Sequence, residues 1–145
     1  MLGNFGQTNY GAAKMGLVGL SNVLALEGAK NNIKCNVIAP IARTRLTEQL
    51  LGPAAETLDP ECVTPLVTYL VSEQCDLTHN IFSVGGGRFA RMFVGLTPGW
   101  FAGKGGKPAP EQIRDHIGEI RDPAGYIIPE SIADEMRAMM EMLKG

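Results

Sequence analysis

Cysteine and histidine are scarce in this chain, and neither forms a pattern that binds metal ions or builds a disulfide framework. The 145 residues include three cysteines and two histidines. The cysteines are odd in number and widely spaced, which is typical of a reduced intracellular protein. His79 and His116 stand apart, each without a second ligand at metal-binding spacing. We therefore expect no metal site and an intracellular, cytoplasmic location.

Excess charge of one sign and long apolar runs are also missing. The 13 basic and 15 acidic residues give a formal net charge of -2. No basic run is long enough to attract a nucleic acid or an anionic lipid surface. No stretch approaches the roughly 20 apolar residues that span a bilayer. The sequence therefore predicts a soluble protein with neither nucleic acid nor membrane partners.

A long helix is predicted between Thr8 and Ala29. Its apolar and small residues recur at helical spacing, namely Leu17, Val18, Ser21, Leu24 and Ala25. The breadth of this apolar surface predicts a mostly buried helix. Gly16 and Gly19 each weaken a helix by about 1 kcal/mol relative to alanine, so we expect another backbone to approach them closely.

Two strands and a second helix follow the long helix. Residues 33–39 are rich in β-branched side chains and are cut off by Pro40. Asp59-Pro60-Glu61 is typical of a helix start, and Pro65 predicts a kink in that helix. Residues 80–84 form a second apolar strand. Strand, helix and strand make a parallel, right-handed unit, so the sequence predicts an α/β fold.

The composition changes after residue 91, where glycine and proline become frequent. We expect two domains, residues 1–91 and a Gly/Pro-rich connection with a helical extension at residues 92–145. The extension is predicted to hold two amphipathic helices. The first contains Ile113, Ile117 and Ile120, and the second contains Ile132, Met136, Met139, Met140 and Leu143.

The most informative motif is Asn9-Tyr10-Gly11-Ala12-Ala13-Lys14. A spacing of four places the tyrosine and the lysine on one face of a helix, one turn apart. A free phenol is protonated at neutral pH, and a nearby ammonium group favours its ionised form, as acid/base catalysis requires. Taken alone, a tyrosine and a lysine at this spacing are more often ordinary surface residues of a helix.

The neighbours of this pair resemble the active-site helix of short-chain dehydrogenases/reductases almost residue for residue over residues 6–17. Further segments resemble, in order, that family's sixth strand, next helix and seventh strand: residues 33–40, 59–72 and 81–87. Residues 3–10 and 110–116 are most similar to the (3R)-hydroxyacyl-CoA dehydrogenase part of type 2 peroxisomal multifunctional enzymes and their bacterial relatives. The resemblance implies the C-terminal part of a Rossmann-type doubly wound parallel sheet, and a peroxisomal location for a eukaryotic relative.

The resemblance also implies roles for individual residues. Tyr10 would be the acid/base, and Lys14 would hold the nicotinamide ribose of NAD or NADP and favour the tyrosinate. The nicotinamide side would be lined by Pro40, Ile41, Ala42 and Thr44. Many family members have glycine where this chain has Ile41, which puts the backbone geometry of that contact in question.

Other parts of the family pattern have no counterpart here. Only nine residues precede Tyr10, too few to include the family's catalytic serine. The glycine-rich phosphate loop of the family's first βα unit has no match either. Residues 85–90 fit a loose G-x-G-x-x-A, but at a late strand, and residues 99–104 fit a phosphate loop still less well.

Two functions remain open. The first is reversible oxidation of a (3R)-hydroxyacyl-CoA or a related secondary alcohol with NAD. The second is a non-catalytic fragment or assembly module, which we expect for the isolated chain. Because two parallel strands form a poor sheet, we expect a marginal monomer. Dimerisation through the helix at residues 9–29, or an N-terminal half supplied in trans, would stabilise it.

Overall fold

The structure is a computed structural model that describes residues 2–45, 47 and 51–144. The chain divides into two compact units, which we call unit 1 (Met1–Met92) and unit 2 (Phe93–Gly145). Unit 1 contains, in chain order, α1 (Thr8–Gly28), η1 (Ala29–Asn31), β1 (Asn36–Pro40), η2 (Gly52–Thr57), η3 (Pro60–Val63), α3 (Thr64–Leu70), β2 (Asn80–Gly85) and β3 (Arg88–Met92), where η denotes a 3-10 helix.

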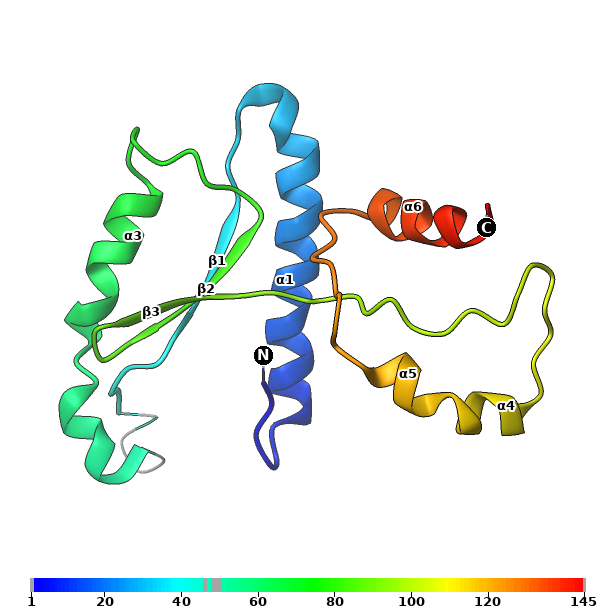
Figure 1. Ribbon diagram of the computed structural model, residues 1–145. Coiled ribbons are helices and arrows are strands. Elements are labelled where there is room, and N and C mark those ends of the chain that lie inside the picture. The colour runs from blue at the N-terminus through cyan, green and yellow to red at the C-terminus, as the bar shows by residue number, and fades with distance from the viewer. Residues whose placement is uncertain (1, 46, 48–50, 145) are drawn as a thin grey trace. The chain divides into compact units, whose positions relative to one another are not determined.

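A three-stranded sheet of order β1-β2-β3 forms the centre of unit 1. β1 and β2 are parallel, whereas β2 and β3 are antiparallel. α1 lies on one side of the sheet and α3 on the other (Figure 1). The predicted α/β fold, a part of a Rossmann-type sheet, is confirmed.

The register of the parallel pair is set by polar groups where the strands begin. The side-chain amide of Asn36 donates to the carbonyl of Leu77 at 2.8 Å, and its side-chain oxygen accepts from the backbone N–H of Asn80 at 3.2 Å. One residue earlier, the backbone N–H of Cys35 donates to the Thr78 hydroxyl at 2.9 Å. These bonds oppose a one-residue slip, which would exchange the two faces of the strand.

α1 is confirmed as a helix, but the prediction that it is mostly buried is wrong. Only one strip is buried, and it consists of Val18, Ser21, Ala25 and Gly28. This strip faces β1, and the Ser21 hydroxyl lies 3.2 Å from the Cys35 sulfur. Leu17 and Leu24 are exposed, because no described part of unit 1 covers the rest of the helix. No described helix is long and apolar enough to cross a membrane.

The close approach predicted at Gly16 and Gly19 is also absent. A Cβ atom added at either glycine would meet nothing within 4 Å in the described chain.

The second helix begins as the sequence predicts. The carboxylate of Asp59 accepts from the backbone N–H of Glu61 at 2.8 Å and caps η3. Instead of one helix with a kink at Pro65, the chain forms the 3-10 turn η3 and then α3. The change falls at Thr64, so that Pro65 occupies the first turn of α3, where no backbone donor is needed.

β3 follows β2 directly and is a strand that the sequence pattern did not predict. Gly86 and Gly87 have φ angles of 55° and 79° and form a two-residue turn between β2 and β3. Positive φ at both central residues is what the tight hairpin turn with the favoured twist requires. The G-x-G-x-x-A run at residues 85–90 is therefore a β-hairpin, not a phosphate loop.

The carboxyl end of β1 passes very close to β2. The backbone N–H of Ile41 donates to the Val84 carbonyl at 2.8 Å, which extends the parallel ladder by one bond. A Cβ atom added at Gly85 would collide with the carbonyl oxygen of Ile41. The absence of a side chain at Gly85 therefore allows the chain after Pro40 to follow the sheet.

Unit 2 contains α4 (Pro110–Asp115), α5 (Ile117–Arg121) and α6 (Ile132–Met142). Leu96 and Ile127 form an antiparallel bridge, and the rings of Phe93 and Tyr126 stack with centroids 5.6 Å apart. The amphipathic helix predicted around Ile113 is divided into α4 and α5, whereas the methionine-rich helix is confirmed as α6.

The division between α4 and α5 falls at His116. Its imidazole ring stacks on the Trp100 indole, with centroids 4.1 Å apart and an interplanar angle of 8°. Its Nδ1 atom lies 2.9 Å from Oε1 of Glu119. These contacts hold His116 at φ -100° and ψ 8°, outside the helical region, and the helix is interrupted there.

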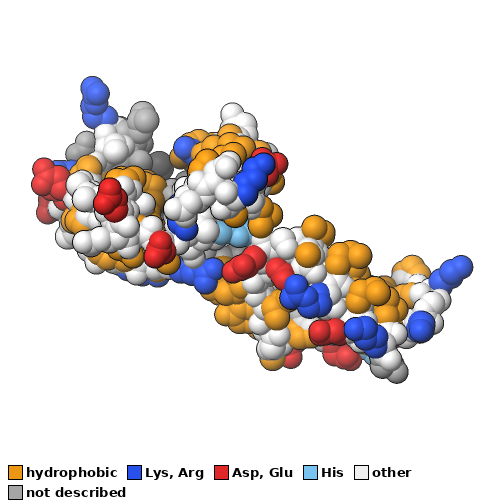
Figure 2. Space-filling view, turned by 90° about the horizontal axis from the view of Figure 1, so that it is seen from above, with side chains coloured by type: hydrophobic (Ala, Val, Ile, Leu, Met, Phe, Trp, Pro, Cys, Tyr) orange, Lys and Arg blue, Asp and Glu red, His pale blue; other side chains and the backbone are white. Residues whose placement is uncertain are grey.

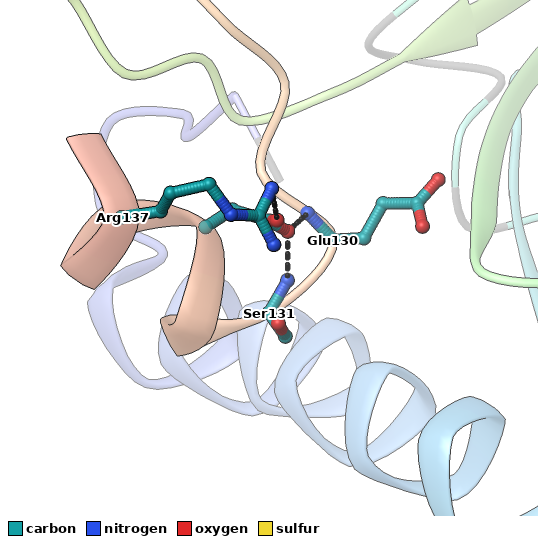
Figure 3. A network of polar contacts seen from close by, with 4 residues as sticks. Glu130, Ser131 and Arg137 are labelled. Atoms are coloured by element: carbon teal, nitrogen blue, oxygen red, sulfur yellow. Dashed lines mark hydrogen bonds and ion pairs between the residues drawn. The ribbon is translucent and has the colours of Figure 1, made fainter. Parts of the chain in front are cut away.

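Asp134 anchors the start of α6 (Figure 3). Its Oδ2 atom accepts from the backbone N–H groups of Glu130 and Ser131 at 2.9 and 3.1 Å. Its Oδ1 atom lies 3.2 Å from the guanidinium of Arg137. The two backbone donors, and after them Arg137, hold the pKa of Asp134 below its ordinary value of 3.8.

The core of the described chain is small. The buried hydrophobic residues are Val18, Ala25, Ala55, Cys75, Ile81 and Val84. Many large apolar side chains remain exposed, including Leu20 and Leu26 of α1 at 55% and 52%, and orange side chains are widespread on the face in Figure 2. A chain with so little buried apolar surface gains little free energy from folding alone.

We expect the melting temperature of the chain to rise with protein concentration, because association would cover the β1 edge and the exposed side of α1. Circular dichroism melts at concentrations that differ about twentyfold would measure the shift. Light scattering gives the mass at each concentration. A monomer with a high, concentration-independent transition would contradict this expectation.

We expect Gly85→Ala to destabilise the chain by about 1–3 kcal/mol, because the new methyl group meets the Ile41 backbone. Gly16→Ala is the control, since its methyl group meets nothing and alanine stabilises a helix by up to about 1 kcal/mol over glycine. Urea unfolding would measure both. Equal effects of the two substitutions would show that the close approach at Gly85 is not energetically important.

We expect the start of α6 to loosen in acid. Because folding lowers the pKa of Asp134, its carboxylate stabilises the fold fully above the ordinary value of 3.8, and the stabilisation is lost as the pH falls through the folded-state pKa. The amide signals of Glu130 and Ser131 would report the transition by NMR. Asp134→Asn should remove it, whereas Glu135→Gln, the same charge change in the same helical turn, should leave it in place.

Candidate functional site

The tyrosine and lysine of the sequence motif lie together on the first two turns of α1. The ammonium nitrogen of Lys14 lies over the Tyr10 ring, 5.4 Å from its centroid. Tyr10 is 54% exposed and Lys14 is exposed as well. The helical spacing therefore produces a cation–π contact beside a solvent-exposed phenol.

The second part of the predicted site is the loop that leaves β1. Two backbone hydrogen bonds connect it to neighbouring segments. The N–H of Ile41 donates to the Val84 carbonyl, and the N–H of Arg43 donates to the Leu58 carbonyl at 2.7 Å. Within the loop, the Thr47 side chain forms hydrogen bonds with two other residues. Its hydroxyl accepts from the backbone N–H of Thr44 at 2.8 Å and donates to the Ala42 carbonyl at 2.8 Å.

Thr47 is a residue that the sequence analysis did not single out. Its signal was available, since a threonine three residues after another in a loop is typical of a local hydroxyl-to-backbone turn. Residues 47–51 show a weak helical periodicity in the sequence, and the short helix that this predicts falls largely outside the described residues. The hydrogen bonds of Thr47 connect two of the predicted nicotinamide-side residues, Ala42 and Thr44.

The structure explains how this chain accommodates Ile41 at a position where many family members have glycine. Ile41 is 49% exposed, while its backbone N–H is bonded to the Val84 carbonyl of β2. The close backbone contact is accommodated by Gly85 on the neighbouring strand. Glycine is therefore not needed at position 41 for the loop to leave β1 in this direction.

The chain direction brings the two parts of the site to the same end of unit 1. α1 runs up the view in Figure 1 and β1 returns downward, so the start of α1 and the end of β1 face the same way. No hydrogen bond or ion pair joins Tyr10 or Lys14 to residues 40–44 in the described chain. Three hollows of about 780, 310 and 400 Å³ lie elsewhere, and neither Tyr10 nor Lys14 lines them.

A dinucleotide cofactor fits the described residues only in part. Exposed polar groups of Tyr10, Lys14 and the ordered loop at residues 40–44 can hold a ribose and a carboxamide. The pyrophosphate normally lies at a glycine-rich turn between a strand and a helix. Among the described segments, the glycine-rich turn after a strand leads into β3 instead, so no cradle for a pyrophosphate is present there.

The chain has relatives of known class. A family profile described as short chain dehydrogenase matches residues 1–51, which include α1 and β1. A short-chain type dehydrogenase/reductase of Mycobacterium tuberculosis is 48% identical over 126 residues, which make up 86% of this chain and 43% of the relative. The peroxisomal multifunctional enzyme type 2 of Mus musculus is 43% identical over 143 residues, covering 97% of this chain and 20% of the enzyme.

Solved structures agree with these relatives. The full-length peroxisomal multifunctional enzyme type 2 of Drosophila melanogaster superposes with a TM-score of 0.84 at 31% identity, over 99% of this chain and 26% of that enzyme. A short chain dehydrogenase of Mycobacterium avium superposes with a TM-score of 0.59, over 82% of this chain and 40% of that protein. This chain therefore spans less than half the length of these relatives. The expectation from the sequence is confirmed: the chain belongs to the short-chain dehydrogenase/reductase family.

Proposed function

We propose that this chain supplies the proton-exchanging part of an NAD- or NADP-dependent dehydrogenase that acts on a 3-hydroxyacyl-CoA or a related secondary alcohol. The observation that carries the proposal is the Lys14 ammonium over the ring of an exposed Tyr10. The substrate class comes from the similarity to peroxisomal multifunctional enzymes, which extends over nearly the whole chain.

Tyr10 can perform the acid/base step. In the reducing direction, its hydroxyl gives a proton to the carbonyl oxygen of the substrate while hydride adds to the carbonyl carbon, and the product is an alcohol. Lys14 then stabilises the phenolate, which recovers a proton from solvent. A bound nicotinamide supplies the hydride or accepts it in the reverse direction. The ordered turn at residues 40–44 would position the nicotinamide side of the site.

We propose further that the chain works as an assembly module that needs an additional segment. β1 is an edge of the described sheet, and a parallel strand beside it would complete the pairing. The same segment would bring the strand–turn–helix cradle for the pyrophosphate of the dinucleotide, which the turn after β2 does not form. A second copy of the chain, packed through the exposed side of α1, is the alternative partner.

We propose an intracellular location. The relatives from Mus musculus and Saccharomyces cerevisiae are peroxisomal enzymes by name, which supports a peroxisomal location if the source is eukaryotic and a cytoplasmic one otherwise.

The proposal predicts that Tyr10→Phe lowers kcat for acetoacetyl-CoA reduction about 10²- to 10⁴-fold, because it removes the acid/base group. The assay follows NADH oxidation by the chain co-expressed with the corresponding N-terminal half of the mycobacterial relative. Tyr69→Phe is the matched control, since Tyr69 is an exposed tyrosine of α3 away from the motif. It should leave kcat unchanged.

Two outcomes would contradict the proposal. Equal activity of Tyr10→Phe and the unmodified chain would exclude Tyr10 as the acid/base. Turnover by the chain alone, with no companion segment, would exclude the assembly module.

A further inference from the structure

A glycine-rich loop in unit 2 carries two lysines, and side-chain contacts hold the residues on both sides of it. We call residues 101–108 the lysine loop. Before it, the Thr97 hydroxyl donates to the Ile120 carbonyl at 3.0 Å, and the Trp100 indole stacks on His116. After it, the backbone N–H of Ala109 donates to the side-chain oxygen of Gln112 at 3.0 Å. Both ends of the loop are therefore held on α4 and α5.

The tip of the loop is a tight turn with an uncovered backbone. The N–H of Gly106 donates to the Gly103 carbonyl at 3.0 Å, and a Cβ atom added at Gly106 would lie 2.5 Å from the Ala102 carbonyl oxygen. Gly103 and Gly105 have φ angles of 92° and 73°, and nothing lies within 4 Å of an added Cβ. Backbone N–H groups in such turns are open to an anion.

The charge of the loop is of one sign. Lys104 and Lys107 are exposed, and neither forms an ion pair with any described residue. No aspartate or glutamate occurs from Met92 to Pro110. The two ammonium groups therefore stand three residues apart, on a loop with fixed ends and without a counter-ion from its own segment.

We infer that the lysine loop binds phosphate groups of a nucleotide-type ligand, and specifically those of the CoA thioester. The choice of CoA rests on the proposed function, whereas the preference for phosphate rests on the loop itself. Ammonium groups and free backbone N–H groups both donate to phosphate oxygens, and charged hydrogen bonds of this kind are among the strong ones. Phe101, which is 41% exposed, precedes the turn in sequence and is an aromatic side chain on which an adenine ring can stack.

The test measures the Kd of CoA for the full chain by isothermal titration calorimetry. Lys104→Gln combined with Lys107→Gln should raise the Kd about tenfold or more, since it removes two charged hydrogen-bond donors. Lys30→Gln combined with Lys34→Gln is the matched control, because it removes the same charge from exposed lysines of unit 1. Trp100 is the only tryptophan in the chain, so its emission should change when CoA binds to the unmodified loop.

NADH and inorganic phosphate are titrated in parallel to identify the source of the phosphate. A loss of NADH binding without a loss of CoA binding would assign the phosphate to the cofactor and overturn the CoA assignment. Equal effects of the two double variants, or no binding of CoA by the unmodified chain, would overturn the loop as a site. Because CoA binding needs no turnover, CoA binding through the loop together with full activity of Tyr10→Phe in the co-expressed assay would contradict the proposed function and not this inference.

Discussion

The parallel pairing of β1 with β2 is the interaction on which unit 1 depends. Asn36 sets its register, Gly85 lets the chain continue past Pro40 along the neighbouring strand, and α1 covers it through a narrow buried strip. If the pairing slipped by one residue, the apolar side chains of β1 would change faces. The loop that carries the predicted nicotinamide-side residues would then no longer leave the sheet in the same way at the end of unit 1 where α1 starts.

The same pairing leaves two surfaces without a described partner, the outer edge of β1 and the outer side of α1. The outer side of α1 is apolar and the edge of β1 presents unpaired backbone groups, and the described core is too small to make either surface unimportant for stability. The exposure of these two surfaces supports the proposed role, because an additional segment or a second copy of the chain would cover them. A chain that holds an acid/base pair but needs a strand and a phosphate cradle from elsewhere is suited to work in an assembly.

The candidate site shows where sequence reasoning succeeds. A spacing of four on a helix is enough to predict that Tyr10 and Lys14 meet, because helical geometry is local. The roles of both residues in catalysis remain predictions. The support of the loop at residues 40–44 could not be predicted, since it depends on Thr47 and on the contact between Gly85 and Ile41, which are distant in sequence.

Local patterns in the sequence by themselves determined the family, α1, the parallel strand pair, the Asp59 cap and α6. The helices, the cap and the individual strands depend on residues within about one or two helical turns or on a short apolar run. The parallel pairing and the family follow from the order of these segments along the chain. Tertiary structure alone decided that most of α1 is exposed, that residues 85–90 form a hairpin and that His116 divides α4 from α5. These features depend on which surfaces find a partner, and side-chain contacts between distant segments settle that question.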